Sequence, residues 1–363
     1  MHFKQFTAII TTALLLAGCG NAAENAGAEQ TASMSETVSE QASEPVTESD
    51  GAVSQEIFAM DTYMVVKAYG DRAKDAVTAA VTEIQRLDAL LSTGSEDSEV
   101  SVLNRAGGGS LSTDTETLIE RSLQLYEDTD GAFDLSIYPV MELWGFTDDS
   151  FAVPDTVELH DTLALVDASK VTLNTEEHTV SYGTDGMKID LGGIAKGYTS
   201  ARVSEIFKSY GVESGLLNLG GNVQAIGAKT DGSSWNVAIT NTDEDGYLGV
   251  LKIEDQAVIT SGGYERYFEE DGVRYHHIID PATGYPADNG VISSSIISSD
   301  GMLADGLSTS LYVMGLDDAI AYWQDHSEEF DFVLEDESGD LYITEGIAEA
   351  FSSDLNVTIV KKE

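Results

Sequence analysis

The sequence IDLGGIAKGY at residues 189–198 indicates a strand end, a glycine turn and then a helix, because apolar residues follow it at helical spacing up to residue 207. Glycines at such a turn let the backbone approach a ligand closely, and the N-terminus of the following helix favours anionic groups. The stretch fits neither the dinucleotide-binding pattern GxGxxG nor the phosphate-loop pattern GxxxxGK[ST]. It predicts a phosphate-binding turn of another kind.

A second segment, SDGMLADGLST at residues 299–309, carries a candidate metal site. A helix beginning near Met302 would place Asp305 and Thr309 four residues apart, on one face. Mg²⁺ takes oxygen ligands and keeps positions open for substrate phosphates. An aspartate and a threonine at this spacing also occur as an N-terminal charge and a half-buried hydroxyl, so the segment alone leaves both interpretations open.

The third segment, YHHIIDPATGYP at residues 275–286, predicts a strand with two histidines that runs into an Asp-Pro turn. His277 is a candidate for proton transfer or for a hydrogen bond to phosphate, with a structural role as the alternative. His276 would face the opposite side of the strand, which favours a structural role.

Six blocks, in the family's order, resemble the ApbE family of flavin transferases and span the chain from about residue 54 to its end. They are MxT at 60–62, GxFD at 131–134, DLGGIAKG at 190–197, NLGGN at 218–222, HxIDPxTG at 277–284 and ADxLST at 304–309. The resemblance implies Mg²⁺-dependent transfer of FMN from FAD to a Thr or Ser hydroxyl of a client flavoprotein, with release of AMP. FAD would then be a substrate. The alternatives are an FAD pyrophosphatase that yields FMN and AMP, and a non-catalytic flavin-binding lipoprotein.

The resemblance also implies roles for single residues. The metal would be held by Asp305, Thr309 and the carbonyl oxygen of Gly193, and His277 and Asp305 would be the catalytic pair. Contacts to FAD would come from Met60, Ala132, Phe133, Asp134, Asp190, Lys196 and Ile279. For Phe133 core packing is the alternative, and for Ile279 the contact would use the backbone.

Two positions depart from the family pattern. Asp61 stands where members usually have glycine, which would place a carboxylate near the flavin unless it points away. Gly94 stands where many members have a tyrosine that contacts the flavin ring. Another aromatic side chain, Tyr63 or Tyr264, would then stack on the flavin ring, or the stacking would be weaker.

The N-terminus predicts export and anchoring. Residues 1–18 combine Lys4 with a short apolar run, which is typical of a signal peptide, and LAGC at 16–19 resembles a bacterial lipobox. Cys19 would be acylated, for example with palmitate, and the protein held on the extracytoplasmic face of the cell membrane. The alternative is a cleaved secretory signal with an incidental cysteine. Residues 19–52, acidic and poor in large apolar side chains, would form a flexible tether.

A formal net charge of −46 with only 18 Lys and Arg excludes nucleic acid as a partner and adhesion to anionic lipid beyond the anchor itself. A pyrophosphate ligand must therefore meet positive potential from Mg²⁺, from backbone N–H groups and from a few cations such as Lys196. By family analogy, the client would be an exported flavoprotein subunit of a membrane redox complex.

Runs of strands separated from runs of helices favour an α+β fold. We expect a strand over 52–69, helices over 72–91 and 114–130, and short strands between 216 and 298, including 265–269 and 275–279. The resemblance places residues 53–363 in one domain of two related α+β halves, T-fold-like, with mixed sheets and flanking helices.

Overall fold

The structure is a computed structural model that describes residues 43–240 and 246–362. The predicted signal peptide, Cys19 and most of the predicted tether lie outside these residues. Within them, no helix has the length and apolar character needed to cross a membrane.

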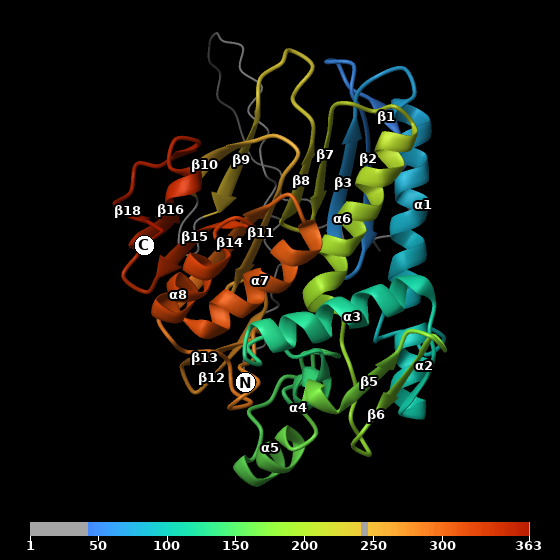
Figure 1. The fold of residues 1–363 in the computed structure, drawn as a ribbon, viewed down its shortest axis with the longest axis vertical. Helices are drawn as coiled ribbons and strands as arrows, with labels where there is room; N and C mark the ends of the chain where they lie inside the picture. Colours follow the sequence, from blue (N-terminus) through green and yellow to red (C-terminus); the bar gives the residue numbers. More distant parts are fainter. Residues whose placement is uncertain (1–42, 241–245, 363) are drawn as a thin grey trace, which may run out of the picture. The chain divides into compact units, whose positions relative to one another are not determined.

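One long, mostly antiparallel sheet organises the described part of the chain (Figure 1). Its parallel pair is β16 with β18. In spatial order the strands are β1 (Val46–Thr47), β2 (Val53–Ala59), β3 (Thr62–Ala68), β7 (Gly215–Leu219), β8 (Asn222–Ile226), β11 (Ala257–Gly262), β14 (Val291–Ser298), β15 (Asp331–Asp336), β16 (Leu341–Thr344) and β18 (Val357–Val360).

Three helices lie beside one another on one face of this sheet: α1 (Ala73–Leu91), α6 (Gly192–Ser209) and α7 (Gly301–Met314), as Figure 1 shows. Helix α8 (Leu316–His326) follows α7 and contacts β15. In α1 the buried residues recur at helical spacing, which confirms the helix predicted at 72–91. The helical face of the sheet therefore carries an apolar core.

A small sheet of β9 (Trp235–Thr240), β10 (Tyr247–Ile253) and β17 (Phe351–Ser352) covers the opposite face. Successive residues of a strand point to opposite faces. Ile296 of β14 accordingly joins the core under the helices, and Ile297 joins the core under the small sheet. Strands with both faces covered bury nearly every residue, as β14 does.

The remaining elements lie mostly at one end of the helical layer. Helix α3 (Thr113–Asp128), predicted at 114–130, crosses the ends of α6 and α7. The others are α2 (Glu99–Ala106), β4 (Gly108–Ser110), α4 (Tyr138–Leu143), α5 (Thr156–Leu163), β5 (Val171–Asn174), β6 (Thr179–Tyr182), β12 (Tyr267–Glu270), β13 (Val273–His276) and the 3-10 turns η1 (Leu135–Ile137), η2 (Ala168–Lys170) and η3 (Glu345–Ile347). The predicted α+β class is confirmed.

The single strand predicted at 52–69 is wrong, because β2 and β3 form a hairpin there. The two loop residues, Met60 and Asp61, have φ values of 49° and 58°, as a type I′ turn requires. No Gly, Pro or Asn-Gly pair marks this turn in the sequence, so the apolar alternation seemed to continue through it. Glycine adopts this backbone without strain, which accounts for the residue usual in the family at position 61.

Three other elements have bounds that differ from the predicted ones. Strands β12 and β13 are offset from the predictions at 265–269 and 275–279, so His277 lies just beyond its strand. Helix α6 begins at Gly192, so the two glycines form its first turn and no strand precedes them at residue 189.

The predicted tether ends too late. Residues 43–52 belong to the folded domain, where β1 pairs with β2. The buried ammonium of Lys67 lies 2.6 Å from Glu48 and 3.5 Å from Asp50. A buried cation requires paired carboxylates, so these two acidic residues are held against the sheet.

Candidate functional site

The site is built on the close approach of α6 and α7. A Cβ atom on Gly197 would lie 2.2 Å from the carbonyl oxygen of Gly301 and 2.7 Å from Cβ of Asp305. Only glycine at 197 therefore allows the two helices to meet at this separation. The contact places the first two turns of α6 against the turn of α7 that carries Asp305.

Asp305 is buried, with 5% of its surface exposed. Its Oδ2 accepts a hydrogen bond of 2.7 Å from the amide of Gly197, and its Oδ1 accepts one of 2.9 Å from Nδ2 of Asn222. Burial raises the pKa of Asp305, while the charge of Lys196 and these hydrogen bonds oppose the rise. The carboxylate is thus fixed by donors from two different elements.

The Gly197 amide also affects the hydrogen bonding of the Gly193 carbonyl. In a regular α-helix the amide of residue 197 bonds the carbonyl of residue 193. Here the Gly197 amide is directed to the Asp305 carboxylate. The Gly193 carbonyl lies one turn before this amide on α6, and because a carbonyl oxygen has two lone pairs it can accept a further ligand.

Thr309 lies one turn beyond Asp305 on α7 and is half-buried. Its Oγ1 is 3.3 Å from Oγ of Ser261 on β11, which also contacts Ser308 at 2.7 Å. No group of three or more His, Cys, Asp and Glu side chains that could hold a metal occurs in the described residues. One carboxylate, one hydroxyl and one carbonyl nevertheless form an all-oxygen set, which fits Mg²⁺ bound with several waters.

Lys196 and Glu265 add charge beside Asp305. The Glu265 side chain reaches solvent, and its Oε1 lies 4.0 Å from where a Cβ on Gly221 would be. Protein nevertheless surrounds this carboxyl on most sides, and that burial raises its pKa to about 7. The positive charge of Lys196 opposes the rise, and the negative charge of Asp305 adds to it. The sequence analysis did not identify Glu265.

His277 lies just after β13 and is half-buried. Its Nδ1 is 3.1 Å from the carbonyl oxygen of Arg266. Because a carbonyl only accepts, Nδ1 carries the proton and Nε2 is the free base. Burial lowers the pKa of His277 to about 4. The neighbouring His276 bonds Ala287 O and the amide of Ile278, as a structural histidine does.

Asp190 lies two residues before the first residue of α6. Its Oδ1 accepts a hydrogen bond of 2.8 Å from the amide of Gly192. Burial raises its pKa, Arg266 opposes the rise, and Asp61 adds to it. Asp61 belongs to the β2–β3 turn, in which the amide of Met60 donates to Oδ1 of Asp88 at 2.9 Å. Because the charges of Arg266 and Asp61 both act on Asp190, these residues lie in one part of the site.

Comparison with known proteins agrees with this arrangement of motifs. The sequence matches the ApbE family over residues 60–334. The chain belongs to the ApbE family. It is 36% identical over 278 residues to the FAD:protein FMN transferase of Treponema pallidum, covering 70% of this chain and 77% of that relative. It is 35% identical over 266 residues to the FAD:protein FMN transferase of Klebsiella pneumoniae, covering 72% and 82%.

Solved structures of the ApbE family share the fold. The ApbE protein of Thermotoga maritima superposes with a TM-score of 0.78 at 32% identity, over 82% of this chain and 99% of that one. The flavin transferase ApbE of Vibrio cholerae superposes with a TM-score of 0.75 at 28% identity, over 82% and 99%. The predictions that the chain is a transferase and has the ApbE fold are confirmed.

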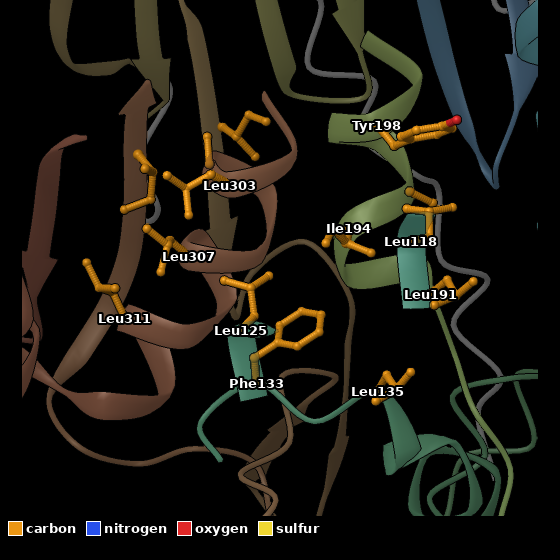
Figure 2. Close-up of a cluster of buried hydrophobic side chains, with 14 of the residues drawn as sticks. Leu118, Leu125, Phe133, Leu135, Leu191, Ile194, Tyr198, Leu303, Leu307 and Leu311 are labelled. Atoms are coloured by element: carbon orange, nitrogen blue, oxygen red, sulfur yellow. The ribbon is translucent and has the colours of Figure 1, made fainter. Parts of the chain in front are cut away.

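Three residues predicted to contact FAD have side chains engaged within this ApbE domain. Both oxygens of Asp134 accept hydrogen bonds, Oδ1 from Ser136 at 2.7 and 2.6 Å and Oδ2 from the Ala168 amide at 3.1 Å. Phe133 lies in the core among side chains of α3, α6 and α7 (Figure 2). Ile279 packs in an apolar cluster with Trp144. Their side chains therefore contribute to the packing and hydrogen bonding of the domain itself.

The two ApbE departures lie at exposed or open positions. Asp61 is exposed. Gly94 has ordinary backbone, and a Cβ there would meet only Oγ of Ser92, at 3.7 Å. Of the candidate substitutes for the missing tyrosine, Tyr63 is 52% exposed and stacks edge-on with Phe58, whereas the Tyr264 ring folds against Gly262.

Two surface hollows, of about 320 and 570 Å³, lie away from this site. The first is lined by α6, β8 and the start of α7, and the second lies on α5. Neither is lined by Asp190, His277 or Asp305. The geometry of the motif residues, and not either hollow, therefore locates the site.

Proposed function

We propose that this chain transfers FMN from FAD to a threonine or serine hydroxyl of a client protein, in a reaction that depends on Mg²⁺ and releases AMP. The observation that carries the proposal is the Asp305 carboxylate, bonded to the Gly197 amide in the first turns of α6 and coupled to Lys196, whose charge also acts on His277. The names of the relatives support flavin transfer.

The metal would be held by Asp305, Thr309 and the Gly193 carbonyl. When bound, Mg²⁺ supplies positive charge to the pyrophosphate as its bridging bond breaks. Lys196 supplies a positive charge beside these ligands, and this charge acts on both Asp305 and Glu265. A domain so rich in carboxylates needs these positive charges to hold an anionic substrate.

The base would be His277. Its Nδ1–H is held by the Arg266 carbonyl, which leaves Nε2 to take a proton. With a pKa of about 4 the ring stays neutral at pH 7. A base of such low pKa accepts the proton only as the hydroxyl attacks, so proton transfer and attack occur together.

The client hydroxyl oxygen attacks the phosphorus on the FMN side and forms one P–O bond. The P–O bond to the bridging oxygen breaks, and that oxygen leaves with AMP. The hydroxyl proton passes to Nε2 of His277 and then to solvent. If water replaces the hydroxyl, the products are FMN and AMP.

The deciding experiment incubates the purified protein with FAD, Mg²⁺ and a protein domain that carries a candidate acceptor threonine, followed by mass spectrometry. An added mass of FMN minus water supports transfer. Free FMN without the adduct indicates the pyrophosphatase, and unchanged FAD indicates the flavin-binding lipoprotein.

We further propose that the protein is lipid-anchored through Cys19 on the extracytoplasmic face of a bacterial membrane, where the client is an exported subunit of a membrane redox complex. The lipobox-like LAGC and the status of Cys19 as the sole cysteine support this. Cys19→Ser should release the protein from membranes or block its processing. Purified Cys19→Ser protein should remain fully active, and loss of activity would contradict an anchoring role.

A further inference from the structure

Asn222 is buried against the site, and no role was predicted for it. It is the first residue of β8 and is 2% exposed. Its Nδ2 donates to Oδ1 of Asp305 at 2.9 Å. Only the amide nitrogen can donate to a carboxylate, so the chemistry fixes the orientation of this side chain.

A turn of two glycines precedes Asn222. Gly220 and Gly221 have φ values of 67° and 96°, a left-handed backbone that favours glycine. A Cβ on Gly220 would lie 2.2 Å from Oγ1 of Thr62, so the turn is pressed onto β3. The amide of Gly221 donates to Oδ1 of Asn218 at 3.0 Å, which closes the turn without involving Asp305. The two asparagines of NLGGN therefore have separate tasks.

Asp305 is held at both oxygens. The Gly197 amide bonds Oδ2 from α6, and Asn222 bonds Oδ1 from β8. A carboxylate bonded at one oxygen can rotate about its Cβ–Cγ bond, whereas one bonded at both cannot do so without breaking a hydrogen bond. The two donors thus fix the orientation of both oxygens relative to α6 and β8.

We propose that Asn222 is a positioning residue that holds the Asp305 carboxylate in the orientation needed to ligate the divalent cation. The inference rests on the metal site of the proposed function. Hydrogen-bond partners of metal ligands typically contribute about 10–100-fold to metal affinity. Removal of the Asn222 amide should weaken cation binding within this range, because Asp305 must then be oriented by the metal itself.

The test measures Mn²⁺ binding to the purified protein without FAD, by electron paramagnetic resonance, with Mg²⁺ as competitor. Asn222→Leu keeps the number and branching of the side-chain heavy atoms and removes the donor, and Asn222→Ala removes it with less crowding. Asn218→Leu is the matched control, since it alters the same turn away from Asp305. Melting temperatures are recorded for all variants.

We expect Asn222→Leu and Asn222→Ala to bind Mn²⁺ about 10–100-fold more weakly than the wild type. Asn218→Leu should bind within about twofold of the wild type, even where its melting temperature falls. At saturating metal the Asn222 variants should regain most of their turnover, which a general loss of structure would not allow.

Wild-type affinity in both Asn222 variants would overturn the inference, as would equal weakening by Asn218→Leu. A wild-type protein that binds neither cation would instead refute the metal site of the proposed function, and the inference with it. The two failures are distinguished by the wild-type titration.

Discussion

The amide of Gly197 lies 2.7 Å from Oδ2 of Asp305, across 108 residues of sequence. The bond exists because position 197 lacks a side chain. Through it, the first turns of α6 and the carboxylate of α7 form one unit. The last glycine of DLGGIAKG, Gly197, thus acts at a helix contact, in addition to any contact with phosphate.

Gly197→Ala should destabilise the domain and abolish turnover. The new Cβ would meet the backbone oxygen of Gly301 at 2.2 Å, so α6 and α7 must separate. Overpacking of this kind costs about 1–3 kcal/mol or more. Urea unfolding measures the loss. Gly246→Ala, at an open position with ordinary backbone, should change stability by less than about 0.5 kcal/mol. Equal stability of Gly197→Ala and the wild type would contradict the helix contact.

Asp305→Ala and Thr309→Val should remove metal-dependent turnover from a domain that still folds. Loss of the charged ligand should weaken an Mg²⁺ site with few protein oxygens more than loss of the hydroxyl does. Initial rates over a range of Mg²⁺ concentrations measure both effects. Ser310→Ala, on the same helix and bonded to Gly306 O, is the control. Wild-type activity of Asp305→Ala at limiting Mg²⁺ would refute the metal assignment.

His277→Ala should lower kcat by about 10²–10⁴-fold if His277 is the base. In the wild type the acid limb of kcat/KM should lie near the His277 pKa of about 4. A limb near pH 7 would instead point to Glu265, whose pKa is about 7. The low pKa of His277 also affects stability, which should fall as pH drops from about 6.5 towards 4, because the unfolded histidine binds a proton first. Melting temperatures of His277→Gln should lack this component.

Glu265→Gln should stabilise the protein at neutral pH and not at acid pH. The folded pKa of about 7 exceeds the ordinary glutamate pKa of 4.5. Between these values the unfolded chain releases a proton that the folded protein keeps, so the contribution of Glu265 is lost as pH rises. The difference in melting temperature, variant minus wild type, should grow from pH 4.5 to 7 and then level off. The difference in melting temperature should be small, because the Glu265 side chain reaches solvent. A difference that does not vary with pH would contradict the assignment, and Glu269→Gln on β12 is the control.

Gly94→Tyr should tighten FAD binding several-fold if position 94 lies beside the flavin. A stacked aromatic pair contributes about 0.5–1.5 kcal/mol beyond burial. Backbone strain does not oppose the change, because Gly94 is outside the left-handed region and a Cβ has room. Flavin fluorescence titration gives the affinity, with Gly246→Tyr as control. Unchanged affinity at unchanged stability would place Gly94 away from the flavin.

The sequence by itself determined the local elements and the motif blocks. Helix α1 follows from apolar spacing, and α7 from Asp300, whose side chain caps the amides of Met302 and Leu303. Such features depend on residues within one or two turns of each other. The blocks also identified the family, because their order along the chain is a linear property.

The tertiary structure alone decided which groups meet. Asn222 and Asp305 are 83 residues apart, and nothing in their local patterns predicts the hydrogen bond between them. Phe133 lies in the core and Oδ2 of Asp134 accepts a hydrogen bond from the Ala168 amide for the same reason, because both side chains have partners from distant segments. Glu265 lies beside Lys196 and Asp305 because of the fold, and its raised pKa comes from surrounding protein mass. Burial and charge proximity arise from the packing of distant segments, so no local pattern encodes them.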